Sequence, residues 1–268
     1  MTRARTAGDF AYLDHEAPLA FAHRGGALYP PNVGIENSMA AFQAAVDLGY
    51  RYLETDVHAT VDGVVLAFHD SSLDRTTDGS GQVAGLTYDE VSGCKIGGRE
   101  KIPTIAELLV TWPDVRLNID VKEPGAIEPL IRVLRQHRAF DRVCLASFSI
   151  RRIHRIRRLA GPDVATAYGP FGVAALWLAP GRALRRWLLR RPVPCVQVPR
   201  RVGPFELVTE GFVNRAHELG RQVHVWTVDD ATEMRELLDL GVDGIITDRI
   251  DTLREVLTSR GQWKAGEA

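Results

Sequence analysis

Short apolar runs alternate along the chain with segments whose apolar residues recur every three or four positions. Apolar runs bounded by turn-forming residues are typical of buried strands, and the longer spacing is typical of amphipathic helices. The pattern predicts strands at residues 19–24, 51–57, 116–121, 143–148, 164–168, 195–198, 222–228 and 244–247. It predicts helices at residues 36–48, 104–111, 126–138, 149–160, 209–219, 230–240 and 250–258.

Strands that alternate with helices are expected to lie parallel, because a parallel pair needs a crossover connection and a helix supplies it. Gly49, Gly220 and Gly241 directly follow three predicted helices, where a left-handed residue ends a helix. The pattern therefore predicts an α/β fold, a closed (β/α)8 TIM barrel, with an open doubly wound sheet as the alternative. We expect residues 1–268 to form one barrel domain, because such barrels commonly have this length.

Two segments between predicted strands and helices are longer than the connections of a simple alternating β/α fold. Residues 58–103 carry a short extra strand in the sequence VVLAFHD and a loop rich in Gly, Thr and Asp, and they predict a small insertion after the second strand. Residues 169–194 form a long excursion rich in Arg, Trp, Leu and Pro.

Within the excursion, residues 173–191 are both basic and apolar. Leu184, Trp187 and Leu188 would share one helix face, with arginines on the other faces. One interpretation is a loop helix that covers the barrel mouth with its apolar stripe buried. The other is a peripheral contact with a membrane, or a site for an acyl chain.

The composition narrows the class of protein. With 45% hydrophobic and 25% charged residues the chain is globular rather than disordered, and a net charge of −1 gives no overall attraction to nucleic acid. Cys94, Cys144 and Cys195 have neither zinc-site nor disulfide-framework spacing, which fits a reducing, cytoplasmic setting. We expect no signal peptide, since Asp9, Asp14 and Glu16 interrupt the N-terminal region, and no transmembrane helix.

Polar residues stand where a barrel strand should be apolar on both faces. In the sequence RYLETDVH, Glu54 and Asp56 share a strand face that points inward, and Asp120 shares a face with Lys122 on the third strand. Three carboxylates at one rim would repel each other without a cation, so we expect Glu54, Asp56 and Asp120 to bind Mg²⁺ or Ca²⁺. The alternative is a set of salt bridges to Arg or Lys. His58 is expected in the loop that follows.

Two histidines stand at other strand ends. His23 and His69 are candidates for a general acid and a general base, the alternative being hydrogen-bonded packing residues. Arg24 and Lys122 supply positive charge suited to a phosphate group. A cation, an acid, a base and a positive clamp together suit the cleavage of a phosphate diester.

The ordered motifs resemble the signature of the glycerophosphodiester phosphodiesterase family. They are the His-Arg-Gly at residues 23–25, the Glu-Asn-Ser at 36–38, the Glu-Thr-Asp at 54–56 and the His-Asp at 69–70 followed by Leu-Asp-Arg-Thr-Thr, with VHVWTVDD and LGVDGIITDR near the C-terminus. The resemblance extends from about Leu19 to Leu257 and implies a catalytic barrel with a small insertion.

The resemblance also assigns roles. It implies that His23 and His69 are the acid–base pair, that Arg24 binds phosphate or orders the site, and that Glu54 and Asp56 ligate metal. Family members usually carry Glu-x-Lys on the third strand, where this chain has Asp120-Val121-Lys122. Asp120 is one methylene shorter, so it ligates the ion directly or through water.

Three further residues belong to this scheme. Glu36 touches the metal or holds Arg24, or else is an acidic residue in the first turn of a helix. Trp226 packs on a glycerol or choline-like group, or closes the core. Arg75 is expected to pair with Asp74 or Asp78.

The resemblance implies hydrolysis of glycerophosphodiesters to glycerol 3-phosphate and an alcohol. In the family a neighbouring substrate hydroxyl is thought to attack phosphorus and form a cyclic phosphate that water then opens. Two alternatives stay open, a lysophospholipase D-like enzyme that acts on lipid diesters and a catalytically silent barrel that serves as a membrane adaptor. The expected partner is a small-molecule or lysolipid phosphodiester for the two enzymes and a membrane for the adaptor. The sequence does not define the head group, the ion or the oligomeric state.

Overall fold

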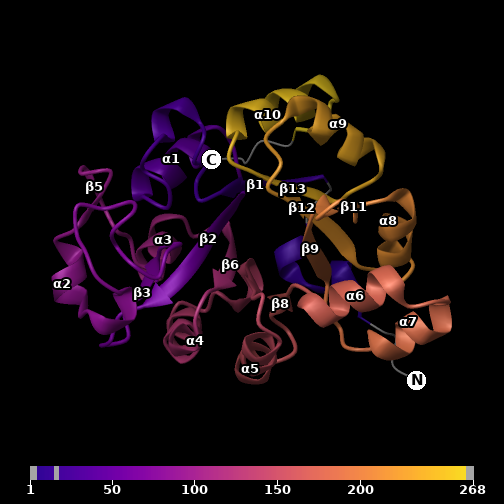
Figure 1. The fold of residues 1–268 in the computed structure, drawn as a ribbon, viewed down its shortest axis with the longest axis horizontal. Coiled ribbons are helices and arrows are strands. Elements are labelled where there is room, and N and C mark those ends of the chain that lie inside the picture. Colours follow the sequence, from indigo (N-terminus) through magenta and orange to yellow (C-terminus); the bar gives the residue numbers. More distant parts are fainter. Residues whose placement is uncertain (1–4, 15–17, 264–268) are drawn as a thin grey trace.

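The computed structural model describes residues 5–14 and 18–263, and its central element is a barrel of parallel strands (Figure 1). The expected domain of residues 1–268 and the N-terminal segment around Glu16 thus extend in part outside the described residues. The barrel strands follow one another in the order β8-β7-β6-β2-β1-β13-β12-β9. Their bounds are β1 Leu19–His23, β2 Tyr52–Ala59, β6 Arg116–Val121, β7 Val143–Ala146, β8 Ala165–Thr166, β9 Cys195–Pro199, β12 Gln222–Trp226 and β13 Gly244–Thr247.

The barrel is nearly closed by a short contact between the two end strands. Ala167 follows β8 and forms a parallel bridge with Cys195 of β9, and the Tyr168 backbone N–H donates to the Cys195 carbonyl at 3.0 Å. This contact confirms the predicted barrel over the open doubly wound sheet. All eight predicted strands are present, although β8 is shorter than predicted.

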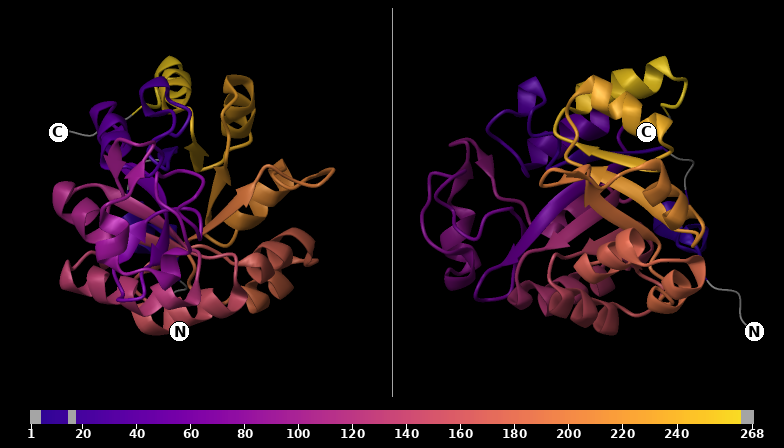
Figure 2. Two further views of the ribbon diagram at one scale, coloured as in Figure 1. Left: turned by 60° about the vertical axis from the view of Figure 1, so that its left-hand side comes forward. Right: turned by 45° about the vertical axis from the view of Figure 1, so that its right-hand side comes forward.

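Helices surround the barrel, as the views in Figures 1 and 2 show. Each of the seven predicted helices is present, and most begin a residue or more later than predicted because a capping residue precedes them; Ser38, Thr104 and Thr209 accept backbone N–H donors in this position. Gly49 and Gly220 have φ values of 94° and 68°, as predicted for helix ends. The bounds are α1 Met39–Asp47, α3 Ile105–Thr111, α4 Ile127–Gln136, α5 Ile150–Ala160, α8 Glu210–His217, α9 Ala231–Asp239 and α10 Ile250–Ser259.

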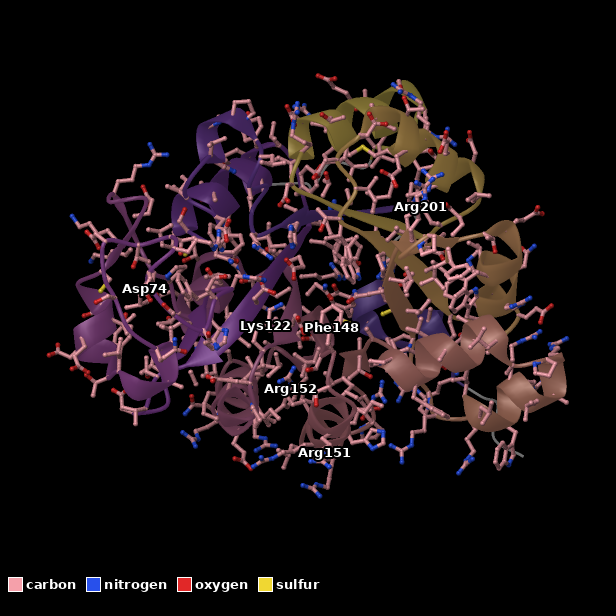
Figure 3. The ribbon with its side chains drawn as sticks, in the orientation of Figure 1. Asp74, Lys122, Phe148, Arg151, Arg152 and Arg201 are labelled. Carbon is pink, nitrogen blue, oxygen red and sulfur yellow. The ribbon has the colours of Figure 1, made fainter. Side chains whose placement is uncertain are left out.

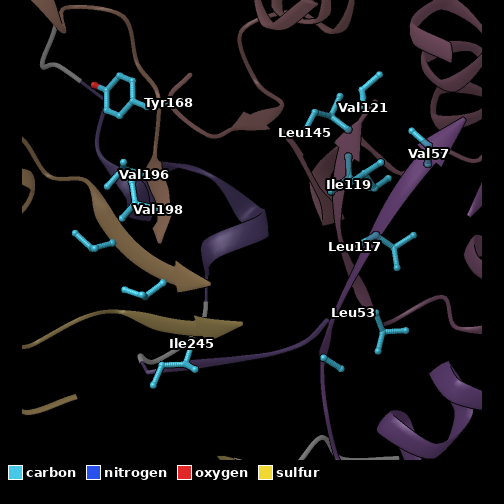
Figure 4. Close-up of a cluster of buried hydrophobic side chains, with 14 of the residues drawn as sticks. Leu53, Val57, Leu117, Ile119, Val121, Leu145, Tyr168, Val196, Val198 and Ile245 are labelled. Carbon is cyan, nitrogen blue, oxygen red and sulfur yellow. The ribbon is translucent and has the colours of Figure 1, made fainter. Parts of the chain in front are cut away.

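The alternating residues of the strands divide the core into two clusters. Leu53 and Val57 of β2 and Ile119 of β6 point outward and pack with the helices (Figure 4). Tyr52 and Phe21 point into the barrel, where the Tyr52 hydroxyl donates to the Tyr12 carbonyl at 2.7 Å. Tyr12 belongs to two N-terminal 3-10 turns, Ala7–Asp9 and Ala11–Leu13. The base of the barrel is thus filled by apolar residues, and its polar residues lie nearer the carboxyl ends of the strands.

The insertion after β2 has its own short elements. β3 (Val65–Ala67) is the extra strand predicted in VVLAFHD, and it pairs antiparallel with the end of β2. α2 (Tyr88–Ser92) and a hairpin of β4 (Lys95–Ile96) and β5 (Glu100–Lys101) follow. These short elements were not predicted, because segments of two to five residues carry too little periodicity.

The excursion forms two short helices and leads to a further hairpin. α6 spans Pro170–Leu178 and α7 spans Arg182–Leu188, and Pro180 and Gly181 lie between them. β10 (Arg201–Val202) and β11 (Phe205–Glu206) form an unpredicted hairpin after β9. Within the described part of the chain, every helix is too short or too polar to cross a lipid bilayer.

Candidate active site

A pocket of about 640 Å³ opens at the carboxyl ends of the barrel strands. Seven of the predicted site residues, and Trp226 as an eighth, line it: His23, Arg24, Glu54, Asp56, His69, Asp120, Lys122 and Trp226. Lys122 and Phe148, which both line the pocket, lie side by side near the centre of Figure 3. Glu36 does not line the pocket and contacts it through Arg24.

The His-Arg-Gly-Gly sequence forms a tight turn directly after β1. Arg24 has φ of 51°, and Gly25 and Gly26 have φ of 82° and 89°. A Cβ on Gly25 would lie 2.8 Å from the backbone carbon of Ala41 in α1, so glycine is required there both by its conformation and by the close approach of the helix. The turn places the His23 and Arg24 side chains at the pocket rim.

His23 is held by two carboxylates. Its Nδ1 lies 2.7 Å from Asp248 Oδ1, and its Nε2 lies 3.7 Å from Glu54 Oε2. A carboxylate accepts hydrogen bonds, so Nδ1–H donates to Asp248 and Nε2 is directed toward the pocket. Burial by itself lowers the pKa of His23, but Glu54 and Asp248 outweigh it and raise the pKa above its ordinary value.

Asp248 was not predicted as a site residue. It directly follows β13, at the carboxyl end of the last barrel strand, in the sequence LGVDGIITDR. That position was the available signal, because polar residues at the carboxyl ends of barrel strands form the active sites of such folds.

The three predicted metal-binding carboxylates are buried and lie on neighbouring strands. Asp56 of β2 pairs directly with Asp120 of β6, and Glu54 lies two residues before Asp56 on the same face. Burial, and then repulsion from Asp56, raises the pKa of Glu54 to about 8. Burial also raises the pKa of Asp120. The inward placement predicted for these residues is confirmed.

Cationic side chains partly neutralise this cluster. Lys122 Nζ lies 2.7 Å from Asp56 Oδ1 and 2.8 Å from Asp120 Oδ2, and Arg24 Nε lies 3.2 Å from Asp56 Oδ2. Burial alone would lower the pKa of Lys122, but the two carboxylates raise it. Among residues 5–14 and 18–263, no three His, Cys, Asp or Glu side chains converge in the geometry of a metal site.

The donor set nevertheless fits a hard divalent cation. Glu54 Oε2, Asp56 Oδ2 and Asp120 Oδ1 are buried and accept no hydrogen bond from the described residues. Buried carboxylate oxygens without a donor are costly, and oxygen ligands are those that Mg²⁺ and Ca²⁺ prefer. Glu54, Asp56 and Asp120 are therefore the residues that could hold such an ion.

His69 belongs to a chain of ion pairs that runs along the pocket rim. Its Nδ1 lies 2.6 Å from Asp70 Oδ1, and Asp70 is also bound by the Arg75 guanidinium. Arg75 Nη2 lies 2.7 Å from Glu36 Oε1, and the same oxygen lies 3.1 Å from Arg24 Nη1. Burial raises the pKa of Asp70, but hydrogen bonds from Arg75 and His69 outweigh it and lower the pKa to about 2.

This series of ion pairs contradicts two of the predictions made from the sequence. Arg75 pairs with Asp70 and Glu36, and not with Asp74 or Asp78, because the loop turns its guanidinium toward the pocket rim. Glu36 holds Arg24, as one of its predicted alternatives stated, whereas its placement in a first helical turn is wrong because α1 begins at Met39.

His58 was expected in a loop, and this expectation is also wrong. β2 continues to Ala59 because β3 pairs with its last three residues, and His58 is buried there. His58 Nε2 lies 3.1 Å from the His69 carbonyl. His58 thereby supports the backbone of a pocket residue from beneath.

The wall opposite the carboxylates is apolar. Phe148 and Trp226 meet edge to face with ring centroids 5.6 Å apart, and Val173 and Trp177 of α6 lie on the same pocket. α6, in the first part of the excursion, therefore lies beside the pocket at the barrel mouth. Of the residues expected to be buried on α7, Leu184 and Trp187 are 41% and 63% exposed, so that part of the expectation is wrong.

Arg185 differs from the other arginines of α7 in its burial. It is buried on α7, where its guanidinium donates to the Ala179 carbonyl and lies 3.2 Å from Glu218 Oε2. It joins the two helices of the excursion to α8.

The strands, with a polar pocket at their carboxyl ends, define a (β/α)8-barrel enzyme. The sequence model of the glycerophosphoryl diester phosphodiesterase family matches residues 23–252, and the chain belongs to this family.

Individual relatives agree with this assignment. The chain is 44% identical over 255 residues to the probable glycerophosphodiester phosphodiesterase 2 of Mycobacterium tuberculosis, covering 94% of this chain and 95% of that protein. Its fold is similar to a putative glycerophosphoryl diester phosphodiesterase of Silicibacter pomeroyi, with a TM-score of 0.78, 24% identity and coverage of 95% and 100%. It is also similar to an Oleispira antarctica phosphodiesterase solved with the product sn-glycerol-3-phosphate, with a TM-score of 0.76, 22% identity and coverage of 92% and 99%.

Proposed function

We propose that this protein is a divalent-metal-dependent hydrolase that cleaves glycerophosphodiesters to glycerol 3-phosphate and an alcohol. The observation that carries the proposal is one pocket that holds two histidines and three buried carboxylate oxygens without hydrogen-bond donors. Membership of the family and the product named for the Oleispira antarctica phosphodiesterase support the same substrate class. One barrel domain carries the whole activity in this proposal.

Glu54, Asp56 and Asp120 hold the ion, which when bound offsets negative charge on the phosphoryl oxygens. Arg24 and Lys122 bind the phosphate from the side, since both line the pocket and carry fixed positive charge. Lys122 exchanges its contacts with Asp56 and Asp120 for a phosphate oxygen when the ion is present. The choice between Mg²⁺ and Ca²⁺ is part of the test below.

His23 and His69 act as the acid–base pair. Each has its Nδ1 held by a carboxylate, Asp248 for His23 and Asp70 for His69, which leaves both Nε2 atoms for proton transfer. One Nε2 takes the proton of the glycerol hydroxyl next to the ester as that oxygen bonds to phosphorus. The other donates a proton to the alcohol oxygen as its bond to phosphorus breaks, and water then opens the cyclic phosphate with the roles reversed.

Metal-depleted protein tests the proposal with glycerophosphocholine as substrate. We expect no cleavage in EDTA, recovery with Mg²⁺ or Ca²⁺ added separately, and loss of activity in Glu54→Gln, His23→Ala and His69→Ala. Full activity of Glu54→Gln would refute the metal assignment. Unchanged properties of both histidine variants, together with no cleavage by the wild type, would support a silent binding barrel instead.

The apolar wall favours a second candidate function, a lysophospholipase D-like activity. Phe148, Trp177 and Trp226 would hold the acyl-bearing glycerol or the choline-like group beside the phosphate. Comparison of kcat/KM for glycerophosphocholine and lysophosphatidylcholine separates the two. A preference for the lysolipid that is lost in Trp177→Ala supports the second candidate, and equal loss on both substrates opposes it.

We place the enzyme in the cytoplasm. Cys94, Cys144 and Cys195 are free thiols, as a reducing compartment keeps them. Fractionation of cells that express the chain at its natural level tests this placement.

A further inference from the structure

Positive charge is concentrated in one segment of the chain. Residues 150–205 contain twelve arginines, one aspartate, and neither lysine nor glutamate, whereas the whole chain has 33 basic and 34 acidic residues. The segment comprises α5, β8, α6, α7, β9 and β10, and it ends at Phe205, the first residue of β11. A nearly neutral protein therefore has one strongly cationic region and is acidic elsewhere.

Some of these arginines are used within the fold. Arg155 pairs with Glu128, Arg185 with Glu218, and Arg200 with Glu206. The charge of each of these arginines is compensated by a carboxylate. They do not contribute to a free cationic surface.

Six others are exposed and form no ion pair with a carboxylate in the part of the chain that the structure describes. They are Arg151, Arg158, Arg182, Arg186, Arg190 and Arg191. They lie on α5, on α7 and on the turn after α7, and Figure 3 shows Arg151 projecting from α5 away from the barrel. Six uncompensated charges on adjoining elements favour a polyanionic partner.

Large apolar side chains lie exposed among these arginines. Phe171 and Leu178 of α6 are 57% and 67% exposed, and Trp187 of α7 is 63% exposed. A groove of about 300 Å³ lies between α5, α6 and α7, and its lining includes Ile150, Phe171 and Trp187 beside Arg190 and Arg191. The Arg190 guanidinium lies over the Trp187 ring, 5.7 Å from the ring centroid.

We infer that this arginine face, formed by α5, α6 and α7, docks on an anionic lipid bilayer. The arginines match the charge of acidic headgroups, and the exposed Phe, Leu and Trp side chains enter the boundary between headgroups and acyl chains. Trp and Arg together are typical of that boundary. A nucleic acid or an acidic protein would match the charge but would leave Leu178 and Leu184 in water.

The arginine face adjoins the catalytic pocket. Tyr168 and Gly169 line both the pocket and the groove, and α6 turns Val173 and Trp177 to the pocket and Phe171 to the groove. Docking by this face therefore brings the pocket mouth next to the bilayer, where phosphate diesters with acyl chains reside. This last step rests on the proposed function, while the docking itself does not.

Vesicle sedimentation tests the inference with the full chain. Vesicles of phosphatidylcholine with 30% phosphatidylglycerol are compared with pure phosphatidylcholine at low salt. We expect binding to the anionic vesicles alone, and a loss on the order of 100-fold for Arg182→Glu/Arg186→Glu/Arg190→Glu, since each basic residue near such a surface contributes about fivefold. Arg132→Glu/Arg235→Glu/Arg254→Glu, with three exposed arginines changed on α4, α9 and α10, is the matched control and should bind as the wild type does.

Trp187→Ala supplies a second variant that leaves the charge unchanged. We expect it to bind anionic vesicles about tenfold more weakly, and the wild type to lose tryptophan fluorescence on brominated vesicles more than Trp187→Phe does. The inference would be overturned if the wild type did not bind anionic vesicles, or if it bound single-stranded RNA and not the vesicles. It would also be overturned if the wild type bound anionic vesicles no better than the triple arginine variant does. Cleavage of glycerophosphocholine, measured in parallel, distinguishes these outcomes from failure of the proposed function, because none of the changed residues lines the catalytic pocket.

Discussion

His23 Nδ1 and Asp248 Oδ1 lie 2.7 Å apart, although 225 residues separate them in the chain. His23 ends β1 and Asp248 follows β13, and these two strands pair in parallel as neighbours in the barrel. Parallel pairing of the first and the last barrel strand of the sequence is therefore what gives the histidine its carboxylate partner. The pair fixes the imidazole so that Nε2 faces the pocket.

Replacement of Asp248 by Asn should lower activity without removing the fold. An amide cannot hold the imidazolium as a carboxylate does, so we expect kcat/KM to fall on the order of 10²-fold. Because Asp248 raises the pKa of His23, the limb of the pH profile that reports this histidine should move to lower pH. A variant with reduced kcat but an unmoved profile would indicate a merely structural role for Asp248.

The raised pKa of Glu54 should make cation binding depend on pH. Below a pKa of about 8 the carboxyl holds a proton that an ion must displace. The Mg²⁺ or Ca²⁺ concentration for half-maximal thermal stabilisation of metal-depleted protein should therefore rise up to about tenfold for each pH unit below 8. Equal concentrations at pH 6 and pH 8 would contradict the assignment of Glu54 as a ligand.

In metal-free protein, the raised pKa of Glu54 should make folding stability fall as the pH rises, whereas cation binding becomes stronger over the same pH range. The folded protein keeps the Glu54 proton up to about pH 8, whereas the unfolded chain releases it near the ordinary value of 4.5. This contribution to stability is therefore complete below pH 4.5 and is lost as the pH rises toward 8. Thermal melts in EDTA should show this decline in the wild type, and Glu54→Gln should lack it.

Lys122→Met tests two functions of the Lys122 ammonium group, neutralisation of the carboxylates in metal-free protein and binding of the substrate phosphate. Its Nζ contacts Asp56 and Asp120, so the metal-free variant should melt at a lower temperature and gain more from added Mg²⁺ or Ca²⁺ than the wild type does. Loss of a phosphate contact should lower kcat/KM on the order of 10²-fold. Lys101→Met, at an exposed position of β5, is the control, and an equal response of both variants would contradict the proposed role.

The sequence was sufficient to predict the carboxylate cluster. Glu54 and Asp56 stand two residues apart on a strand, and Asp120 stands on another strand with the same alternation. Parallel pairing in register then places Asp56 opposite Asp120 without any information about loops. Period-two alternation and the barrel topology together determine these positions.

The partners of His23, His69 and Arg75 could not be predicted in this way. Arg75 reaches Glu36 across 39 residues, and loop conformation decides such a contact because loop residues have no repeating geometry. His58 was misplaced for a related reason, since the extra length of β2 comes from its antiparallel pairing with β3. The burial of Arg185 could not be predicted either, because it depends on a distant partner, here Glu218.

The turn after β1 allows the steric cost of an added Cβ to be separated from the conformational cost of a positive φ. Gly25 and Gly34 have similar φ values of 82° and 80°. A Cβ on Gly25 would lie 2.8 Å from the Ala41 backbone, whereas a Cβ on Gly34 would have no heavy atom within 4 Å. Gly34→Ala should therefore cost about 1 kcal/mol of unfolding free energy, from conformation alone. Gly25→Ala should cost on the order of 3 kcal/mol, because α1 must also shift.

The same pair tests how the turn positions the site. Displacement of α1 by Gly25→Ala would move Arg24 and His23, the residues directly before the glycine, so kcat should fall even at temperatures where the variant stays folded. Gly34→Ala should retain wild-type kcat. Chemical denaturation gives the two unfolding free energies, and initial rates on glycerophosphocholine give the kinetic effect. Equal losses of stability in the two variants would mean that the contact with α1 does not restrict residue 25, and that conformation alone requires glycine in the turn.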